Sequence, residues 1–143
     1  MKKIGQYTMK GSFDPDAGTT RIVLDDGSFE TGYRIVKFEH VLSNPLVNEE
    51  YRVVVGTEST VSNTFAWDDN TQVAWGYGGN NNSASATFSN FAFVDPDNLI
   101  IQDLYLAGNN QGGGLINYMI TLEKYEISDW QGALSMVRNR SQA

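Results

Sequence analysis

The chain has 143 residues, of which 41% are hydrophobic and 12% aromatic, so it holds enough apolar material for one packed domain. Ten basic and seventeen acidic residues give a net charge of −7, which argues against a general nucleic-acid binder because such proteins carry a basic surface. The lack of cysteine excludes disulfides, thiolate metal sites and thiol catalysis.

Neither a membrane span nor a secretion signal is expected. No stretch approaches the roughly twenty apolar residues that a membrane-spanning helix needs. No apolar run of signal-peptide length follows Lys2 and Lys3. We therefore expect a soluble protein that is made in the cytoplasm and has no membrane partner.

Eight segments have the apolar alternation or the β-branched content that is typical of strands. They are residues 6–10, 19–24, 33–42, 51–55, 72–77, 88–94, 99–106 and 115–125. Turn sequences rich in Asp, Asn, Pro and Gly separate them, such as DPD at 14–16 and again at 95–97.

Alternation also predicts which side chains share a face of each strand. In the segment 33–42, Val36, Phe38, His40 and Leu42 are expected on one face. In the segment 72–77, one face is expected to carry Val73, Trp75 and Tyr77. The last two strands, joined by the glycine-rich residues 107–114, are expected to pair as an antiparallel hairpin.

The order of elements indicates an all-β fold. Because no βαβ alternation is visible, a parallel sheet is not expected. Eight antiparallel strands in one domain, residues 1–143, predict a two-sheet sandwich, most simply a jelly roll; an immunoglobulin-like sandwich is the alternative.

One short helix is predicted at the C-terminal end, residues 128–138, followed by a polar tail, residues 139–143. Ser128 and Gln131 have the spacing of a capping box, and apolar residues follow at helical intervals. A helix this short needs support from packing, so we expect its stripe to bury in the domain or against another subunit. The candidate interface residues are Trp130, Leu134, Val137, Arg138 and Arg140.

Three aspartate-rich stretches could supply oxygen ligands for calcium: Asp14 with Asp16, residues 68–70, and residues 95–98. None continues into the twelve-residue loop of an EF-hand, and the same residues are ordinary in turns. The turn interpretation is preferred, and no metal or other cofactor is expected.

His40 is the one histidine, so any Ser-His-Asp triad would have to use it. It stands on an apolar strand face, and the sequence has no G-x-S-x-G motif. A histidine in the core or at its rim is therefore expected rather than a catalytic one.

Trp67, Trp75 and Tyr77 are the aromatic residues with the most direct functional alternative. On an exposed sheet face they would form a stacking platform for sugars, as in carbohydrate-binding modules. Aromatic residues at alternating positions are more often part of a core, which is the preferred interpretation.

Several stretches of the chain resemble a family of small structural proteins of marine tailed bacteriophages. They are residues 29–38 (FETGYRIVKF), 67–70 (WDDN), 72–75 (QVAW), 94–100 (VDPDNLI), 103–105 (DLY) and the segment from 116 to 142. The resemblance covers most of the chain and is densest in its last fifty residues.

The resemblance implies a capsid-associated jelly roll located in the virion, with no catalytic motif. The leading hypothesis is a non-enzymatic capsid protein, acting as decoration, cement or minor capsid protein. Its expected partners are other virion proteins, foremost the major capsid protein, and further copies of itself, with a trimer favoured. The alternative hypothesis is a carbohydrate-binding module or the head domain of a host-attachment fibre.

Overall fold

The computed structural model describes residues 2–24, 30–45, 49–80 and 88–127. In these ranges the secondary structure consists of eight strands and one short 3-10 helix, Pro15–Ala17. The predicted C-terminal helix (128–138), the tail (139–143) and the candidate interface residues Trp130, Leu134, Val137, Arg138 and Arg140 lie outside them. No helix within the described ranges is long and apolar enough to cross a membrane.

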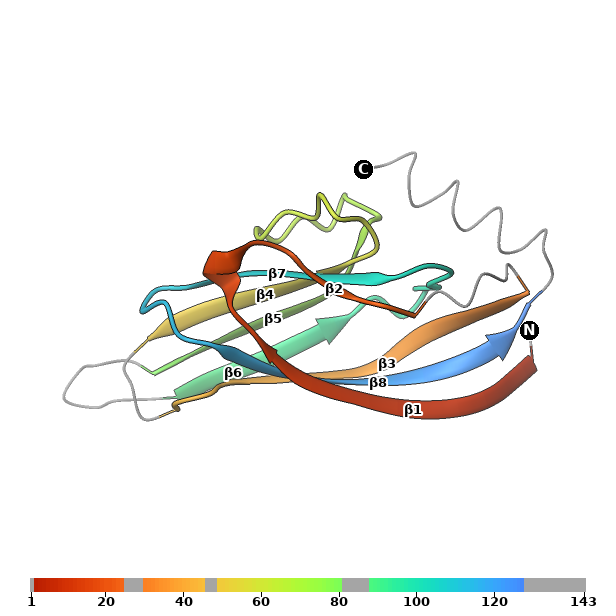
Figure 1. Cartoon of the computed structure of the whole chain (residues 1–143), viewed down its shortest axis with the longest axis horizontal. Coiled ribbons are helices and arrows are strands. Elements are labelled where there is room, and N and C mark those ends of the chain that lie inside the picture. The colour runs from red at the N-terminus through yellow and green to blue at the C-terminus, as the bar shows by residue number, and fades with distance from the viewer. Residues whose placement is uncertain (1, 25–29, 46–48, 81–87, 128–143) are drawn as a thin grey trace.

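The strands form two antiparallel sheets that lie face to face (Figure 1). The three-stranded sheet has the order β1 (Lys2–Phe13), β8 (Ile116–Glu126), β3 (Thr31–Leu42). The five-stranded sheet has the order β2 (Thr20–Ile22), β7 (Leu104–Asn110), β4 (Glu50–Gly56), β5 (Gln72–Asn80), β6 (Phe88–Val94). The prediction of an all-β, antiparallel two-sheet sandwich is confirmed.

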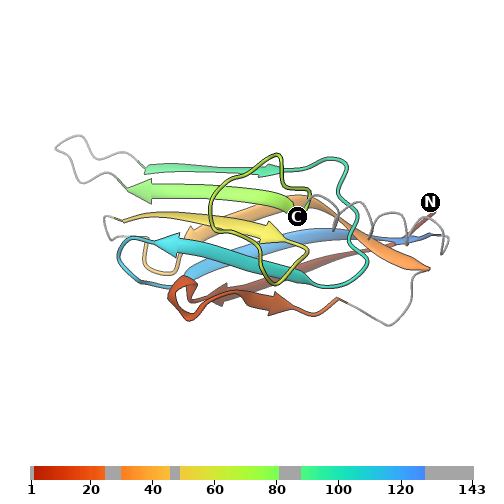
Figure 2. The same cartoon turned by 90° about the horizontal axis from the view of Figure 1, so that it is seen from above.

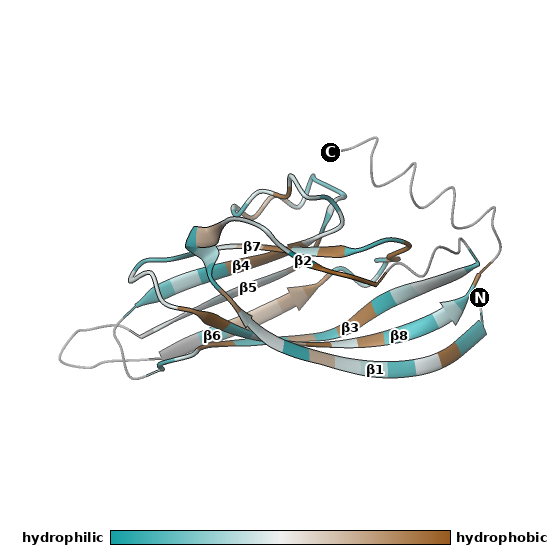
Figure 3. Ribbon diagram, viewed as in Figure 1, coloured by the Kyte–Doolittle hydropathy of each residue, from teal (hydrophilic) through white to brown (hydrophobic). Residues whose placement is uncertain are grey.

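The main core lies between the sheets and follows the alternation of the strands. Hydrophobic and hydrophilic residues alternate along β3 and β8 in Figure 3. The buried members come from both sheets: Phe13, Ile35, Phe38, Leu42, Tyr51, Val53, Val55, Val73, Ala74, Ile100, Leu104, Leu106, Ile116, Ile120 and Leu122. Each large side chain removed from water in this way stabilises the fold by about 1.5–3 kcal/mol.

The predicted face of β3 is wrong at one position. The register between β3 and β8 shifts between Ile35 and Lys37, which marks a β-bulge. Because the bulge adds one residue, Ile35 takes the core position at 1% exposure and Val36 faces solvent at 44%. Phe38, His40 and Leu42 are buried, as the alternation predicts.

The predicted hairpin of the last two strands is also wrong. β7 pairs with β2 and β4, whereas β8 pairs with β1 and β3, so the chain crosses between the sheets after Asn110. β7 starts later than expected because Ile100 is held elsewhere, by two backbone hydrogen bonds with Tyr33 of 2.8 and 2.7 Å. Apolar residues of both strands can then face one core from opposite sheets.

The edges of β3 and β6 meet at one side of the sandwich through side chains. His40 Nε2 lies 2.7 Å from the Phe91 carbonyl oxygen, and the Asn90 amide donates to the His40 carbonyl oxygen at 2.8 Å. Within the five-stranded sheet, the order β7-β4-β5-β6 is that of a Greek key. These contacts close one side of the core and fix the position of β6, the edge strand of the site described below.

Candidate functional site

A long connection, residues 57–71, covers part of the outer face of the five-stranded sheet. Figure 2 shows it passing over the sheet between the end of β4 and the start of β5. Beneath it lies a second apolar cluster, outside the main core, formed by Val54, Val61, Trp75 and Ala107. The connection is therefore packed against the sheet by its own small core.

Gln72 anchors this connection. Its side chain is 1% exposed, and its Oε1 accepts hydrogen bonds from the Ala66 amide at 2.9 Å and from Trp75 Nε1 at 2.8 Å. Its Nε2 donates to the Thr64 carbonyl oxygen at 2.9 Å. Three hydrogen bonds to one buried amide group hold the backbone directly before Trp67 in place.

Five aromatic residues lie together on this outer face; we call them the aromatic surface: Trp67, Trp75, Tyr77, Phe91 and Phe93. The Trp67 ring lies 5.7 Å from that of Trp75 and 5.8 Å from that of Phe93. The Phe91 ring lies 5.3 Å from both the Phe93 and the Tyr77 ring. These separations are those of favourable aromatic pairs, so the rings form one continuous cluster.

The cluster is open to solvent on its outer side. Trp67 is 68% exposed, Phe93 48% and Phe91 42%, whereas Trp75 beneath them is 6% exposed. The aromatic surface thus has a buried base and three exposed rings that do not belong to the core between the sheets.

The outcome for the three predicted platform residues is mixed. Trp67, Trp75 and Tyr77 do lie on one surface, but Trp75 is buried and Tyr77 half-buried. Val73, expected on the same face, belongs to the main core, because the pairing of β4 with β5 shifts between Val55 and Gly56.

Sequence reasoning missed Phe91 and Phe93. The signal was available in part, since two phenylalanines at alternating positions of β6 must share one face. What the sequence did not show is that Phe93 pairs with Trp75 and Phe91 with Tyr77 across β5 and β6.

Several carboxylates neighbour the aromatic surface. Asp68 and Asp69 follow Trp67 in the connection, and Asp95 follows the end of β6, two residues after Phe93. Burial and the nearby carboxylate of Glu50 raise the pKa of the Tyr77 hydroxyl.

Arg52 is the cation next to these rings, on β4 opposite Tyr77. Its guanidinium is engaged within the protein, because Nε donates to the Asn63 carbonyl oxygen at 2.5 Å and Nη2 to Asn63 Oδ1 at 3.2 Å. Asn63 is neutral, so Arg52 keeps its positive charge, but the four carboxylates named above outnumber it and leave the surroundings of the rings with a net negative charge.

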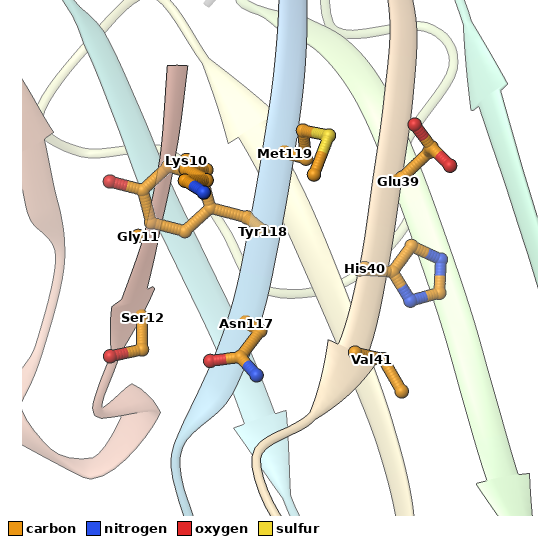
Figure 4. Close-up of a pocket in the computed structure, with 9 residues that line it drawn as sticks. All are labelled: Lys10, Gly11, Ser12, Glu39, His40, Val41, Asn117, Tyr118 and Met119. Atoms are coloured by element: carbon orange, nitrogen blue, oxygen red, sulfur yellow. The ribbon is translucent and has the colours of Figure 1, made fainter. Parts of the chain in front are cut away.

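The outer face of the three-stranded sheet has a different character. An open groove of about 640 Å³ crosses it, lined by β1, β8 and β3 (Figure 4). The side chains over it include the polar Lys10, Ser12, Glu39 and Asn117 and the exposed apolar Val41 and Met119.

His40 contributes backbone to that groove, but its ring is turned into the sandwich. The side chain is 6% exposed, and Nδ1 lies 2.7 Å from the Tyr51 hydroxyl. Burial lowers the pKa of the imidazole, partly offset by the hydrogen bond to the Phe91 carbonyl. The expectation of a core histidine is confirmed, and its neighbours give it a structural role.

The aspartate-rich stretches form hydrogen-bonded turns. Asp14 Oδ1 accepts from the Asp16 amide at 2.9 Å, and Asp95 Oδ1 accepts from the Asp97 amide at 2.9 Å. Asp69 Oδ1 accepts from both the amide and the hydroxyl of Thr71. Over the ranges that the structure describes, no three His, Asp or Glu residues are grouped as a metal site would require.

The exposed rings of the aromatic surface add little to the core between the sheets, so the fold itself does not explain them. No protein-family model, curated protein or solved structure matches the chain. The function is therefore argued from the aromatic surface.

Proposed function

We propose that this chain is a non-enzymatic structural protein of a virus particle that attaches to the capsid through the aromatic surface, as decoration, cement or minor capsid protein. The observation that carries the proposal is the exposure of Trp67, Phe91 and Phe93 beside one another. Together they leave on the order of 300 Å² of aromatic area in water, comparable with the largest apolar patch on a typical monomer, which is often functional.

Such an area is smaller than a whole interface but suits its centre. A stable protein–protein interface buries about 800 Å² on each partner, and a few aromatic residues near its middle provide most of the binding energy. Trp67 and Phe93 would be these central residues, with the surrounding polar groups as the rim.

The strand pairing supports a jelly roll. In that fold an eight-stranded ribbon wraps so that strands pair 1 with 8, 2 with 7, 3 with 6, and 4 with 5. Ladders join β1 to β8, β2 to β7 and β4 to β5. β6 departs from this scheme because it pairs with β5, and it is connected to β3 by the side chains of His40 and Asn90. Jelly rolls are common in viral capsid and lectin domains, so this is support by analogy of fold.

Copies of the chain are proposed to assemble as a homo-oligomer, with a trimer favoured. Closed rings of subunits protect strand edges that would otherwise pair without control. The proposed contact residues, among them Trp130 and Leu134, rest on the sequence of the C-terminal segment alone.

The proposal is tested on intact particles purified from infected cells. Mass spectrometry should find the chain in them in many copies, and purified protein should rebind to particles stripped of it. Trp67→Ala and Phe93→Ser should each weaken rebinding at least tenfold, since central aromatic residues contribute about 2 kcal/mol or more.

Tyr7→Ala is the matched control, because Tyr7 is 52% exposed on β1, in the other sheet. It should rebind like the parent. Absence of the chain from particles contradicts the proposed function, and full rebinding of both aromatic-surface variants contradicts the proposed attachment site.

A carbohydrate-binding module or fibre head is the second candidate, favoured by one observation: Trp67 is 68% exposed, so most of its surface is accessible to a sugar. It ranks second because the rings are tilted rather than coplanar, with interplanar angles of 55°, 79° and 54° for three of the four pairs. The protein is tested for retention on immobilised neutral glycans. If Trp67→Ala loses this retention and Tyr7→Ala keeps it, carbohydrate binding becomes the leading candidate function.

A further inference from the structure

We infer that the partner surface that covers the aromatic surface is basic: a protein segment in which arginine or lysine side chains stand among apolar ones. This inference rests on the proposed function, because it names the chemistry of the partner at the same site. It is argued from the charges around the exposed rings, the state of Trp67 and the use of cations elsewhere in the chain.

The first argument is charge complementarity. Asp68 and Asp69 follow Trp67 in the chain, Asp95 follows β6, and Glu50 lies near Tyr77. Arg52, opposite Tyr77, adds one positive charge, because its bonds to the neutral Asn63 leave the guanidinium charged; the carboxylates still outnumber it. Complementary potentials select partners and speed their encounter, so this rim favours a cationic partner and disfavours an anionic one.

The second argument is the chemistry of the most exposed ring. An indole is the best aromatic acceptor for a cation placed over its face, and such a contact contributes more as water is excluded. Trp67 is 68% exposed and has the rings of Trp75 and Phe93 at 5.7 and 5.8 Å. Two neighbours thus support the ring, and most of its surface is accessible to an arginine or lysine of a partner.

The third argument is that the protein provides its own cations for aromatic rings on other strands. Arg34 lies 5.8 Å from the centre of the Tyr125 ring, and Lys124 lies 5.5 Å from that of Tyr33. Over the described ranges, these contacts are found on β3 and β8 and not at the aromatic surface. A cation placed over the Trp67 ring would therefore belong to the partner.

These arguments disfavour the other occupants. A second copy of the chain facing the same surface would bring the same acidic rim against it, on a protein of net charge −7. Like charges placed opposite each other at an interface oppose binding. An anionic glycan meets the same repulsion, and a neutral glycan can gain hydrogen bonds from its hydroxyl groups to the carboxylates but no charge attraction.

The experiment uses the whole protein and three synthetic peptides of about twelve residues that alternate leucine with arginine, glutamate or serine. Binding is measured by fluorescence anisotropy at about 50 mM and about 500 mM salt, where surface charges are weakly and strongly screened. The arginine peptide should bind at least tenfold more tightly than the other two at low salt, and this preference should shrink at high salt.

Two pairs of variants separate the ring from the charge. Trp67→Ala should lose at least tenfold in affinity for the arginine peptide, and Tyr7→Ala should not change it. Asp68→Asn should weaken binding about threefold at low salt only, in the range of one exposed ion pair. Glu39→Gln removes the same charge from the opposite, polar face and should leave affinity unchanged.

Several results would overturn the inference. They are equal binding of the arginine and glutamate peptides, no binding of either, equal losses in Asp68→Asn and Glu39→Gln, or self-association that Trp67→Ala abolishes. These peptide results would not change whether the chain is found in virus particles. Conversely, absence of the chain from particles would contradict the proposed function without changing the peptide results. Failure of the inference and failure of the proposed function are thus distinguishable.

Discussion

The buried contact between His40, Tyr51 and β6 provides a sharp test of the fold around the aromatic surface. The Phe91 carbonyl oxygen can only accept, so His40 Nε2 carries the proton, and in the neutral ring Nδ1 accepts from the Tyr51 hydroxyl. His40→Ala removes both hydrogen bonds and leaves a cavity beside Gly76, whose Cα packs against the imidazole.

The expected loss of stability follows from these contacts. Each buried polar group left without a partner costs about 1–3 kcal/mol. With the cavity included, we expect the free energy of unfolding to fall by about 3–5 kcal/mol. For a chain of this length one kcal/mol corresponds to about 3 °C, so Tm should fall by about 10–15 °C.

Urea and thermal unfolding at about pH 7.5, where the histidine is neutral, measure this loss. Val41→Ala is the control, since Val41 is the next residue of β3 and is 36% exposed; it should cost less than about 1 kcal/mol. Tyr51→Phe should be non-additive with His40→Ala, because both remove the same hydrogen bond. A loss in His40→Ala no larger than in Val41→Ala would refute the proposed link between β3 and β6.

Three further predictions concern pH, packing and the C-terminal segment. Burial lowers the pKa of His40 in the folded protein, so the unfolded chain binds a proton first as pH falls below about 6.5. Tm should therefore be lower at about pH 5.5 than at about pH 7.5, and His40→Gln should remove most of that difference. If the Tm difference is unchanged in His40→Gln, other titratable groups cause it. Gly76→Ala places a methyl group against the His40 ring and should cost about 1–3 kcal/mol in urea unfolding, with parent-like stability arguing against the contact. Trp130→Ala should either lower Tm at every concentration, if Trp130 anchors in the domain, or yield folded monomers in sedimentation, if it anchors between subunits. If Trp130→Ala matches the parent in both Tm and sedimentation, the C-terminal segment is a solvent-facing tail.

The positions of the eight strands were predictable because their cause is local. Alternating apolar residues bounded by turn residues mark each strand, and each of the eight predicted segments overlaps an observed one. The aspartate turns were predictable for the same reason, since the acceptor and its amide are two residues apart.

Strand partners and bulges were not predictable, because they depend on distant parts of the chain. The pattern of residues 99–125 suits a hairpin, but β7 finds β2 and β4, and β8 lies between β1 and β3. Val36 and Val73 show the effect of one extra residue, since each lies next to a register shift that changes its face.

Three of the five members of the aromatic surface were predictable from the sequence, but the surface as a unit was not. Trp67, Trp75 and Tyr77 stand out in the sequence, whereas Phe91 and Phe93 join them only through the pairing of β6 with β5. Burial of Trp75 and exposure of Trp67 depend on where residues 57–71 fold, and Gln72 fixes that position through three hydrogen bonds, to Thr64, Ala66 and Trp75.

A reconstruction of the intact virus particle by electron cryomicroscopy, at a resolution that places side chains, tests the central claim most directly. The account predicts that the chain sits on the capsid with the rings of Trp67 and Phe93 buried against a neighbouring virion protein. A chain bound to the capsid by another face, with these rings open to solvent, would contradict it.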